Sequence, residues 1–145
     1  PTDVRFIAEH ASLMGDPLAG PAEGLRFRSS RFDLQGNAID PEGRLLVADR
    51  ANRRIKLLTP DGKLLGMWTG MGGPNHVALG KDGLFYIAEQ KADGAPGHIS
   101  IRDASGRILA RWPRRHIHGI CVDSRGDIYT GSTSNNTVDK YVRAR

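Results

Sequence analysis

The chain has 145 residues, a formal net charge of +5 and one cysteine, Cys121. No apolar run is long enough to span a membrane, and a single cysteine excludes an intramolecular disulfide. We therefore expect a soluble protein without membrane contact, and the opening residues contain no recognisable signal peptide. Cys121 lies between Ile120 and Val122, a setting typical of a buried, unreactive thiol.

Residues 1–34 differ from the rest of the chain. Residues 15–24 are rich in Gly, Pro and Ala, and the following stretch mixes Arg and Ser with Phe. No strand–turn–strand order is visible there. We predict that residues 1–34 form an irregular N-terminal segment or the remnant of a repeat.

Three segments after that point align with one another: 39–49, 79–89 and 122–132. Each contains an apolar strand, a turn closed by glycine and a second strand. The turn glycines are Gly43, Gly83 and Gly126, and the spacing between them is 40 and then 43 residues. Four short strands in about 40 residues is the period of a β-propeller blade.

The second halves of the repeats align as well. Residues 55–68 and 99–112 each contain a strand, an Asp-Gly or Ser-Gly turn and a second strand, which ends in Trp68 or Trp112. In the third unit, residues 138–142 take the place of the third strand. We predict an all-β fold of about three four-stranded blades in an open arc, half of a six-bladed ring. The expected blades are 35–73, 74–115 and 116–145.

Two phrases carry a family resemblance: residues 40–55, with the pattern Asp49-x-x-Asn52-x-Arg54, and residues 118–129, which begin His-Gly. They resemble NHL repeats, and their sequence pattern is similar to that of the bacterial group of peptidyl-α-hydroxyglycine α-amidating lyase. The sequence resemblance to gluconolactonase-type propellers is more distant. The resemblance covers about residues 35–145. It implies structural roles for Asp49, Asn52 and Arg54, with the Asp carboxylate bonding backbone N–H groups, and core positions for Trp68 and Trp112.

The resemblance also implies where a metal is bound in that lyase group: at the start of the innermost strands, often by a His-Gly pair. The positions at this offset are Gln35, Asn75 and His118, of which His118 alone keeps the His-Gly pattern. His76 is displaced by one residue, so we expect it to point to the opposite side of its strand from Asn75. A zinc site with one well-placed imidazole is incomplete, whereas Asn75 and Gln35 offer oxygen ligands to Ca²⁺.

These residues are compatible with several functions. The first is a scaffold that binds a protein, peptide or small molecule at a propeller rim, where Arg50 and Gln35 are candidate ligand-binding residues. The second is a metal-dependent lyase or lactonase-like hydrolase, whose Zn²⁺ or Ca²⁺ site is completed by missing blades or a second copy. The third is RNA binding through a basic face, which the scarcity of aromatics among the basic residues disfavours. We expect the chain to be a fragment of a longer propeller, and a homodimer that closes a six-bladed ring is the alternative.

Overall fold

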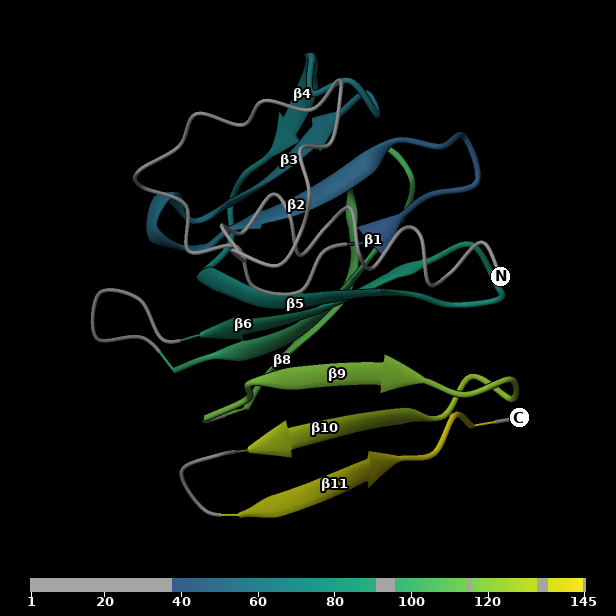
Figure 1. The fold of residues 1–145 in the computed structure, drawn as a ribbon. Coiled ribbons are helices and arrows are strands. Elements are labelled where there is room, and N and C mark those ends of the chain that lie inside the picture. The colour runs from purple at the N-terminus through teal and green to yellow at the C-terminus, as the bar shows by residue number, and fades with distance from the viewer. Residues whose placement is uncertain (1–37, 91–95, 115, 133–135, 145) are drawn as a thin grey trace, which may run out of the picture.

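The computed structural model describes residues 38–90, 96–114, 116–132 and 136–144. The described residues form three antiparallel sheets that stand side by side, and the strand order within each sheet follows the sequence (Figure 1). Blade 1 contains β1 (Ala38–Ile39), β2 (Leu45–Asp49), β3 (Arg54–Leu58) and β4 (Leu64–Trp68). Blade 2 contains β5 (Gly73–Leu79), β6 (Phe85–Gln90), β7 (His98–Arg102) and β8 (Ile108–Pro113). Blade 3 contains β9 (Gly119–Val122), β10 (Ile128–Ser132) and β11 (Thr137–Tyr141).

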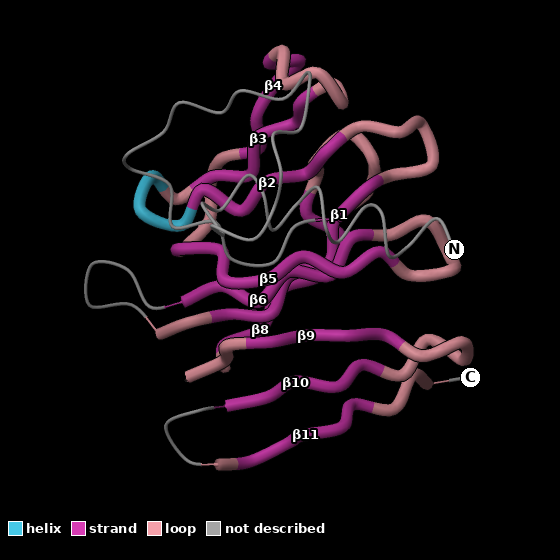
Figure 2. Tube along the Cα trace, viewed as in Figure 1, coloured by secondary structure: helices cyan, strands magenta, loops and turns pink. Residues whose placement is uncertain are grey.

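The fold is an open arc of β-propeller blades, as the repeat predicts. The structure describes three strands in blade 3, and β11 lies where the sequence predicts the third strand, at residues 138–142. One 3₁₀ helix, η1 (Arg50–Asn52), connects β2 to β3 (Figure 2). In the part of the chain that the structure describes, no helix has the length and apolar character needed to cross a membrane.

The turns between first and second strands use the glycines that align in the sequence. Gly43, Gly83 and Gly126 have φ angles of 77°, 74° and 86°, a left-handed conformation that residues with a Cβ adopt only with strain. Each of these glycines donates its N–H to the carbonyl oxygen three residues earlier, which closes the turn. The position of the glycine within each turn therefore helps to set the register of that hairpin.

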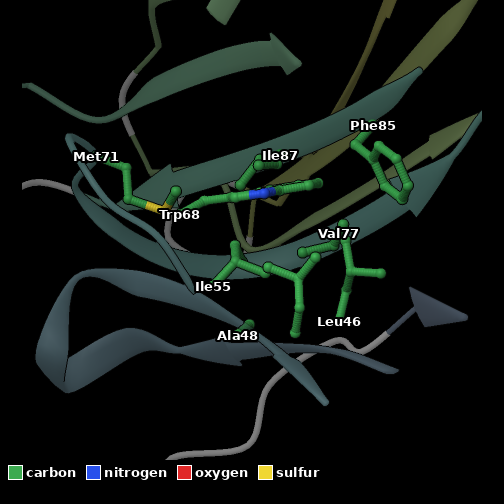
Figure 3. Packing of buried hydrophobic residues seen from close by; sticks show 9 residues of the cluster. Leu46, Ala48, Ile55, Trp68, Met71, Val77, Phe85 and Ile87 are labelled. Carbon is green, nitrogen blue, oxygen red and sulfur yellow. The ribbon is translucent and has the colours of Figure 1, made fainter. Parts of the chain in front are cut away.

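Blades 1 and 2 pack through one apolar cluster (Figure 3). Strand alternation directs Leu46 and Ile55 of blade 1 toward Val77 and Ile87 of blade 2, and all four side chains are at most 2 % exposed. Trp68 closes the cluster, with its ring centroid 5.1 Å from that of Phe85 in an edge-on contact. This confirms the predicted core position of Trp68.

Blades 2 and 3 pack through a second cluster. Here Tyr86, Ala88 and Ile99 of blade 2 meet Ile120 and Ile128 of blade 3. Trp112 lies partly buried beside this cluster and contacts Tyr141, with ring centroids 5.8 Å apart. The middle sheet, blade 2, is therefore packed on both faces, against blade 1 on one side and against blade 3 on the other.

Candidate functional site

The candidate site lies where the innermost strands of blades 2 and 3 begin. β5 and β9 are the first strands of their sheets and lie in contact with each other. Asn75 and His76 belong to the start of β5, and His118 immediately precedes β9. The fold thus brings together three of the residues that the sequence predicts for this site.

Asn75 is 2 % exposed and connects the two blades. Its Nδ2 donates a hydrogen bond to the carbonyl oxygen of Ile117 at 2.7 Å. Its Oδ1 is buried, and no described group hydrogen-bonds to it. A buried acceptor without a hydrogen-bond partner costs about 1–3 kcal/mol of folding free energy, so this amide oxygen destabilises the site.

His76 makes a second connection between the same blades. Its Nδ1 accepts a hydrogen bond from the backbone N–H of Ile120 at 3.1 Å. Burial lowers the pKa of His76 from its ordinary value, and the nearby charge of His118 lowers it further. The imidazole is therefore held neutral, and because Nδ1 accepts, its proton resides on Nε2.

The predicted opposition of Asn75 and His76 is wrong, and the reason is a β-bulge. The pairing of β5 with β6 shifts register between Pro74 and His76, which leaves Asn75 as the extra residue. Both side chains consequently bond to the same segment of blade 3, residues 117–120. Strict strand alternation could not anticipate this arrangement.

His118 is the exposed member of the group. Its backbone N–H donates to the carbonyl oxygen of Gly131 at 2.8 Å, which fixes the residue at the start of β9. No described residue hydrogen-bonds its imidazole. The site therefore presents one accessible imidazole next to two side chains whose hydrogen bonds hold the blades together.

Of the other candidate ligand residues, Gln35 lies outside the described residues. Arg50 is half-buried in η1 and lies against Gly73, the first residue of β5: a Cβ built on Gly73 would come within 3.2 Å of the Arg50 Cγ and carbonyl oxygen. Arg50 is thus placed near the start of β5. Its role in binding stays a prediction.

Asp49 forms the centre of a side-chain network within blade 1. Its carboxylate is fully buried and accepts hydrogen bonds from Asn52 Nδ2 at 2.7 Å and Arg54 Nε at 2.8 Å, with Lys56 Nζ at 3.3 Å. Burial alone would raise the pKa of Asp49, but these partners outweigh it and hold the pKa below its ordinary value. The arrangement, in which three side chains of the same blade hold the carboxylate, suits a structural role.

Glu89 occupies the same repeat position in blade 2 and has a larger network. This fully buried carboxylate accepts hydrogen bonds from Ser100 Oγ at 2.5 Å, from Arg111 at 2.6 Å and from the backbone N–H of Gly72 at 2.9 Å. The bond to Gly72 ties the blade to the preceding inter-blade loop, as the NHL resemblance implies for this position. The Arg111 partner could not be found from sequence, because it lies one strand beyond β7.

The residues present do not fit a metal centre within the described chain. No group of three His, Cys, Asp or Glu side chains comes together there. His76 uses its Nδ1 lone pair for Ile120, and the Asn75 amide is tethered to Ile117. Of these three residues, only the His118 imidazole and the buried Asn75 Oδ1 have no described hydrogen-bond partner, whereas catalytic zinc takes about three protein ligands.

Comparisons with known proteins identify the fold and not a family. No protein-family model matches the sequence, and no curated protein matches it. A functionally unknown protein from Desulfotomaculum acetoxidans is similar in structure, with a TM-score of 0.64 and 14 % identity over 82 % of this chain and 41 % of the other. Virginiamycin B lyase from Staphylococcus aureus gives a TM-score of 0.59 and 16 % identity over 81 % of this chain and 43 % of the lyase.

Hydrazine synthase from Kuenenia stuttgartiensis is also similar, with a TM-score of 0.55 and 14 % identity over 83 % of this chain and 38 % of the synthase chain. This chain therefore spans less than half the length of each of these structures. At such identities the likeness concerns the fold alone. The described chain has the fold of three consecutive β-propeller blades.

Proposed function

We propose that the chain is an NHL-type propeller segment that acts as a binding scaffold for a peptide, protein or small molecule. The proposed binding surface is the rim where β5 and β9 begin. The observation that carries the proposal is the accessible imidazole of His118 beside the paired side chains of Asn75 and His76. Binding residues on a rigid β scaffold are a common use of this architecture.

The chemistry of the rim supports binding rather than catalysis. His76 is neutral and bonded through Nδ1, so it cannot receive a proton at that nitrogen without losing the bond to Ile120. Asn75 holds the blade 3 backbone in place. These two side chains position His118, which is free to donate to or accept from a polar ligand.

The alternative is a metal-dependent enzyme similar to peptidyl-α-hydroxyglycine α-amidating lyase or to the lactonase-like propellers. The meeting of two imidazoles from neighbouring blades favours it, because a propeller site draws its ligands from several blades. Such a site would need further ligands from outside the described residues. Virginiamycin B lyase shares the fold, which makes virginiamycin B a reasonable trial substrate.

RNA binding is disfavoured by the ion pairs of the basic residues. Arg111 and Arg114, from the densest basic cluster, pair with the carboxylates of Glu89 and Asp139. Other described arginines and lysines do the same: Arg44, Arg54, Arg107, Arg125, Lys140 and Arg143. A guanidinium already paired with a carboxylate contributes little to binding a phosphate backbone.

A displayed library of short peptides, selected on the purified chain, tests the proposal. We expect binders whose affinity falls at least about tenfold in His118→Ala, because one polar contact to the ligand is lost. His116→Ala is the matched control, since His116 is also exposed and lies two residues away. Binders indifferent to His118→Ala, or turnover of virginiamycin B by the chain with Zn²⁺, Ca²⁺ or Mg²⁺ added, would contradict the scaffold function.

A further inference from the structure

The acidic side chains gather at one end of the strands, which we call the turn end. It contains the hairpin turns at residues 40–44, 59–63, 80–84, 103–107 and 123–127. The described acidic residues other than Asp49, Glu89 and Asp139 all belong to these turns. Carboxylates brace such turns: that of Asp40 accepts the backbone N–H of Arg44, and that of Asp123 accepts the backbone N–H of Asp127. The hairpins therefore place most of the negative charge at this end.

The opposite end, which we call the loop end, has a different composition. It contains the loops that join second to third strands and one blade to the next, and β5 and β9 begin there. In Figure 2, η1 and the start of β9 lie on the left, whereas the turn after β9 lies on the right. Every described histidine lies at the loop end, together with Arg50 and Arg53: His76, His98, His116 and His118.

Few carboxylates balance the positive groups of the loop end. The described carboxylates there are those of Asp49 and Glu89, and both are fully buried and bound to partners in their own blades. Asp139 lies in the middle of β11 and pairs with Arg114. Among the described residues, the exposed ionisable groups of the loop end are therefore basic, which gives this end a positive potential.

The loop end also holds side chains in left-handed backbone conformations. Arg53, His116 and Asn136 have φ angles of 54°, 60° and 51°, and all three residues are exposed. At the turn end, glycines such as Gly43 and Gly83 adopt this conformation. Strained residues other than glycine gather at functional sites, where the side chain has a use. The backbone therefore favours the loop end as the functional one.

Three blades contribute hydrogen-bond donors around the start of β5. His76 of blade 2 is neutral with its proton on Nε2, and His118, just before blade 3, has an exposed imidazole. Arg50 of blade 1 lies against the first residue of β5. An imidazole in either protonation state donates an N–H group, and a guanidinium only donates. A carboxylate only accepts, so it matches this set of donors.

We propose that the loop end recognises the acidic side chains, Asp or Glu, of a peptide or protein segment. This inference rests on the proposed function and names the ligand class for its surface. A carboxylate at the loop end gains from the positive potential and from the donors of Arg50, His76 and His118. The same ligand at the turn end would meet like charges. Acidic side chains thus select one end of the arc.

Fluorescence anisotropy with two labelled short peptides tests the proposal. One peptide is rich in Glu, and the other is identical except that Gln replaces each Glu. We expect the Glu peptide to bind at least about tenfold more tightly at low salt, because charge-assisted hydrogen bonds are stronger than neutral ones. This advantage should shrink at high salt, which screens exposed charges.

Variants locate the contact at the loop end. Arg50→Gln should weaken binding of the Glu peptide about fivefold, because it removes a positive charge beside β5. Lys81→Gln is the matched control: Lys81 is exposed in the turn after β5, so the same charge is lost at the turn end. His118→Glu, at an exposed position, should abolish the advantage of the Glu peptide and provides an independent test if Arg50→Gln does not fold. Circular dichroism confirms that each variant is folded.

The outcomes separate this inference from the proposed function. Equal affinity for the two peptides, or no binding of the Glu peptide at millimolar concentration, would overturn the inference. So would equal losses in Arg50→Gln and Lys81→Gln, or a phosphoserine peptide that binds where the Glu peptide does not. Each of these results leaves the scaffold proposal intact, because that proposal requires only that peptides selected on the chain depend on His118.

Discussion

A Cβ atom placed on Gly106 would lie 2.2 Å from the Cδ1 atom of Trp68. Gly106 closes the outer hairpin of blade 2, and Trp68 ends the last strand of blade 1. The hairpin backbone therefore rests directly on the indole. This contact joins the outer edges of two blades, where the apolar cluster between them ends.

Gly106→Ala should destabilise the chain by about 2–4 kcal/mol, because it adds overpacking against Trp68 to the strain of a positive φ. Gly43→Ala is the control: Gly43 has a similar φ of 77°, but nothing lies within 4 Å of its Cβ position. It should cost about 1 kcal/mol from backbone strain alone. Urea unfolding of both variants measures the difference, and equal losses would show that the Trp68 contact is unimportant.

The hydrogen bond from Ile120 to His76 makes stability depend on pH. The pKa of His76 is lowered in the folded state, so its contribution is fully present above the unfolded pKa of about 6.5 and is lost as pH falls through the lower folded value. Protonation places an N–H donor at Nδ1 opposite the N–H of Ile120. Stability should therefore decline at mildly acidic pH.

His76→Asn is the matched variant for this prediction. Its Oδ1 can take the place of Nδ1 as acceptor for Ile120, but it does not titrate. Thermal unfolding of both proteins across the acidic range should show a smaller decline for His76→Asn. Parallel curves would mean that other groups cause the pH dependence.

Tyr86 donates a hydrogen bond to Asp82 at 2.8 Å, and Asp82 in turn accepts one from Arg143, which follows β11. Burial, followed by the bond to Asp82, raises the pKa of Tyr86 to about 12. Its contribution to stability is therefore full below the unfolded pKa of about 10 and is lost as pH rises through the folded value. Absorbance titration should show one tyrosine that ionises near 12.

Tyr86→Phe should remove that titration step and cost about 1 kcal/mol of stability at neutral pH. Tyr129→Phe serves as comparison, since the Tyr129 hydroxyl lies 3.3 Å from Asp123 on a less buried residue, and it should cost less. A larger loss in Tyr129→Phe than in Tyr86→Phe would contradict the importance of the Asp82 bond.

Thr130 is 2 % exposed, and its buried hydroxyl has no described hydrogen-bond partner. It aligns with Ile87 of blade 2, which is a fully buried core residue. Thr130→Val should therefore stabilise the chain by about 1 kcal/mol, because it removes an unsatisfied polar group without changing the shape. Thr130→Ser keeps the hydroxyl and loses the methyl group, so it should destabilise. Loss of stability in Thr130→Val, measured by urea unfolding, would reveal a partner for the hydroxyl.

The sheets could be predicted from the sequence because each hairpin is encoded locally. Gly43, Gly83 and Gly126 specify their turns, and strand alternation specifies which side chains are buried. The site was predicted less completely. Asn75 is displaced by a bulge, which depends on how β5 pairs with β6 and leaves no residue signature of its own.

The partners of buried polar groups were the other part that sequence could not supply. Glu89 ends the second strand of its repeat, as Asp49 does, but its bonds to Arg111 and Gly72 depend on packing between strands and loops. Cys121 was predicted to be buried from its apolar neighbours, although burial depends on whether another sheet lies beside it. Local patterns determine which face a residue occupies, whereas its environment depends on the whole arc.

The bonds from Asn75 and His76 to the backbone of residues 117 and 120 have a consequence for the order of folding. Two side chains of the finished second blade offer an acceptor and a donor to a strand that is synthesised later. During synthesis from the N-terminus, the emerging β9 can therefore align on a surface that already exists, before its own hairpin partner leaves the ribosome. The completed second blade would thus serve as the template on which the third is built.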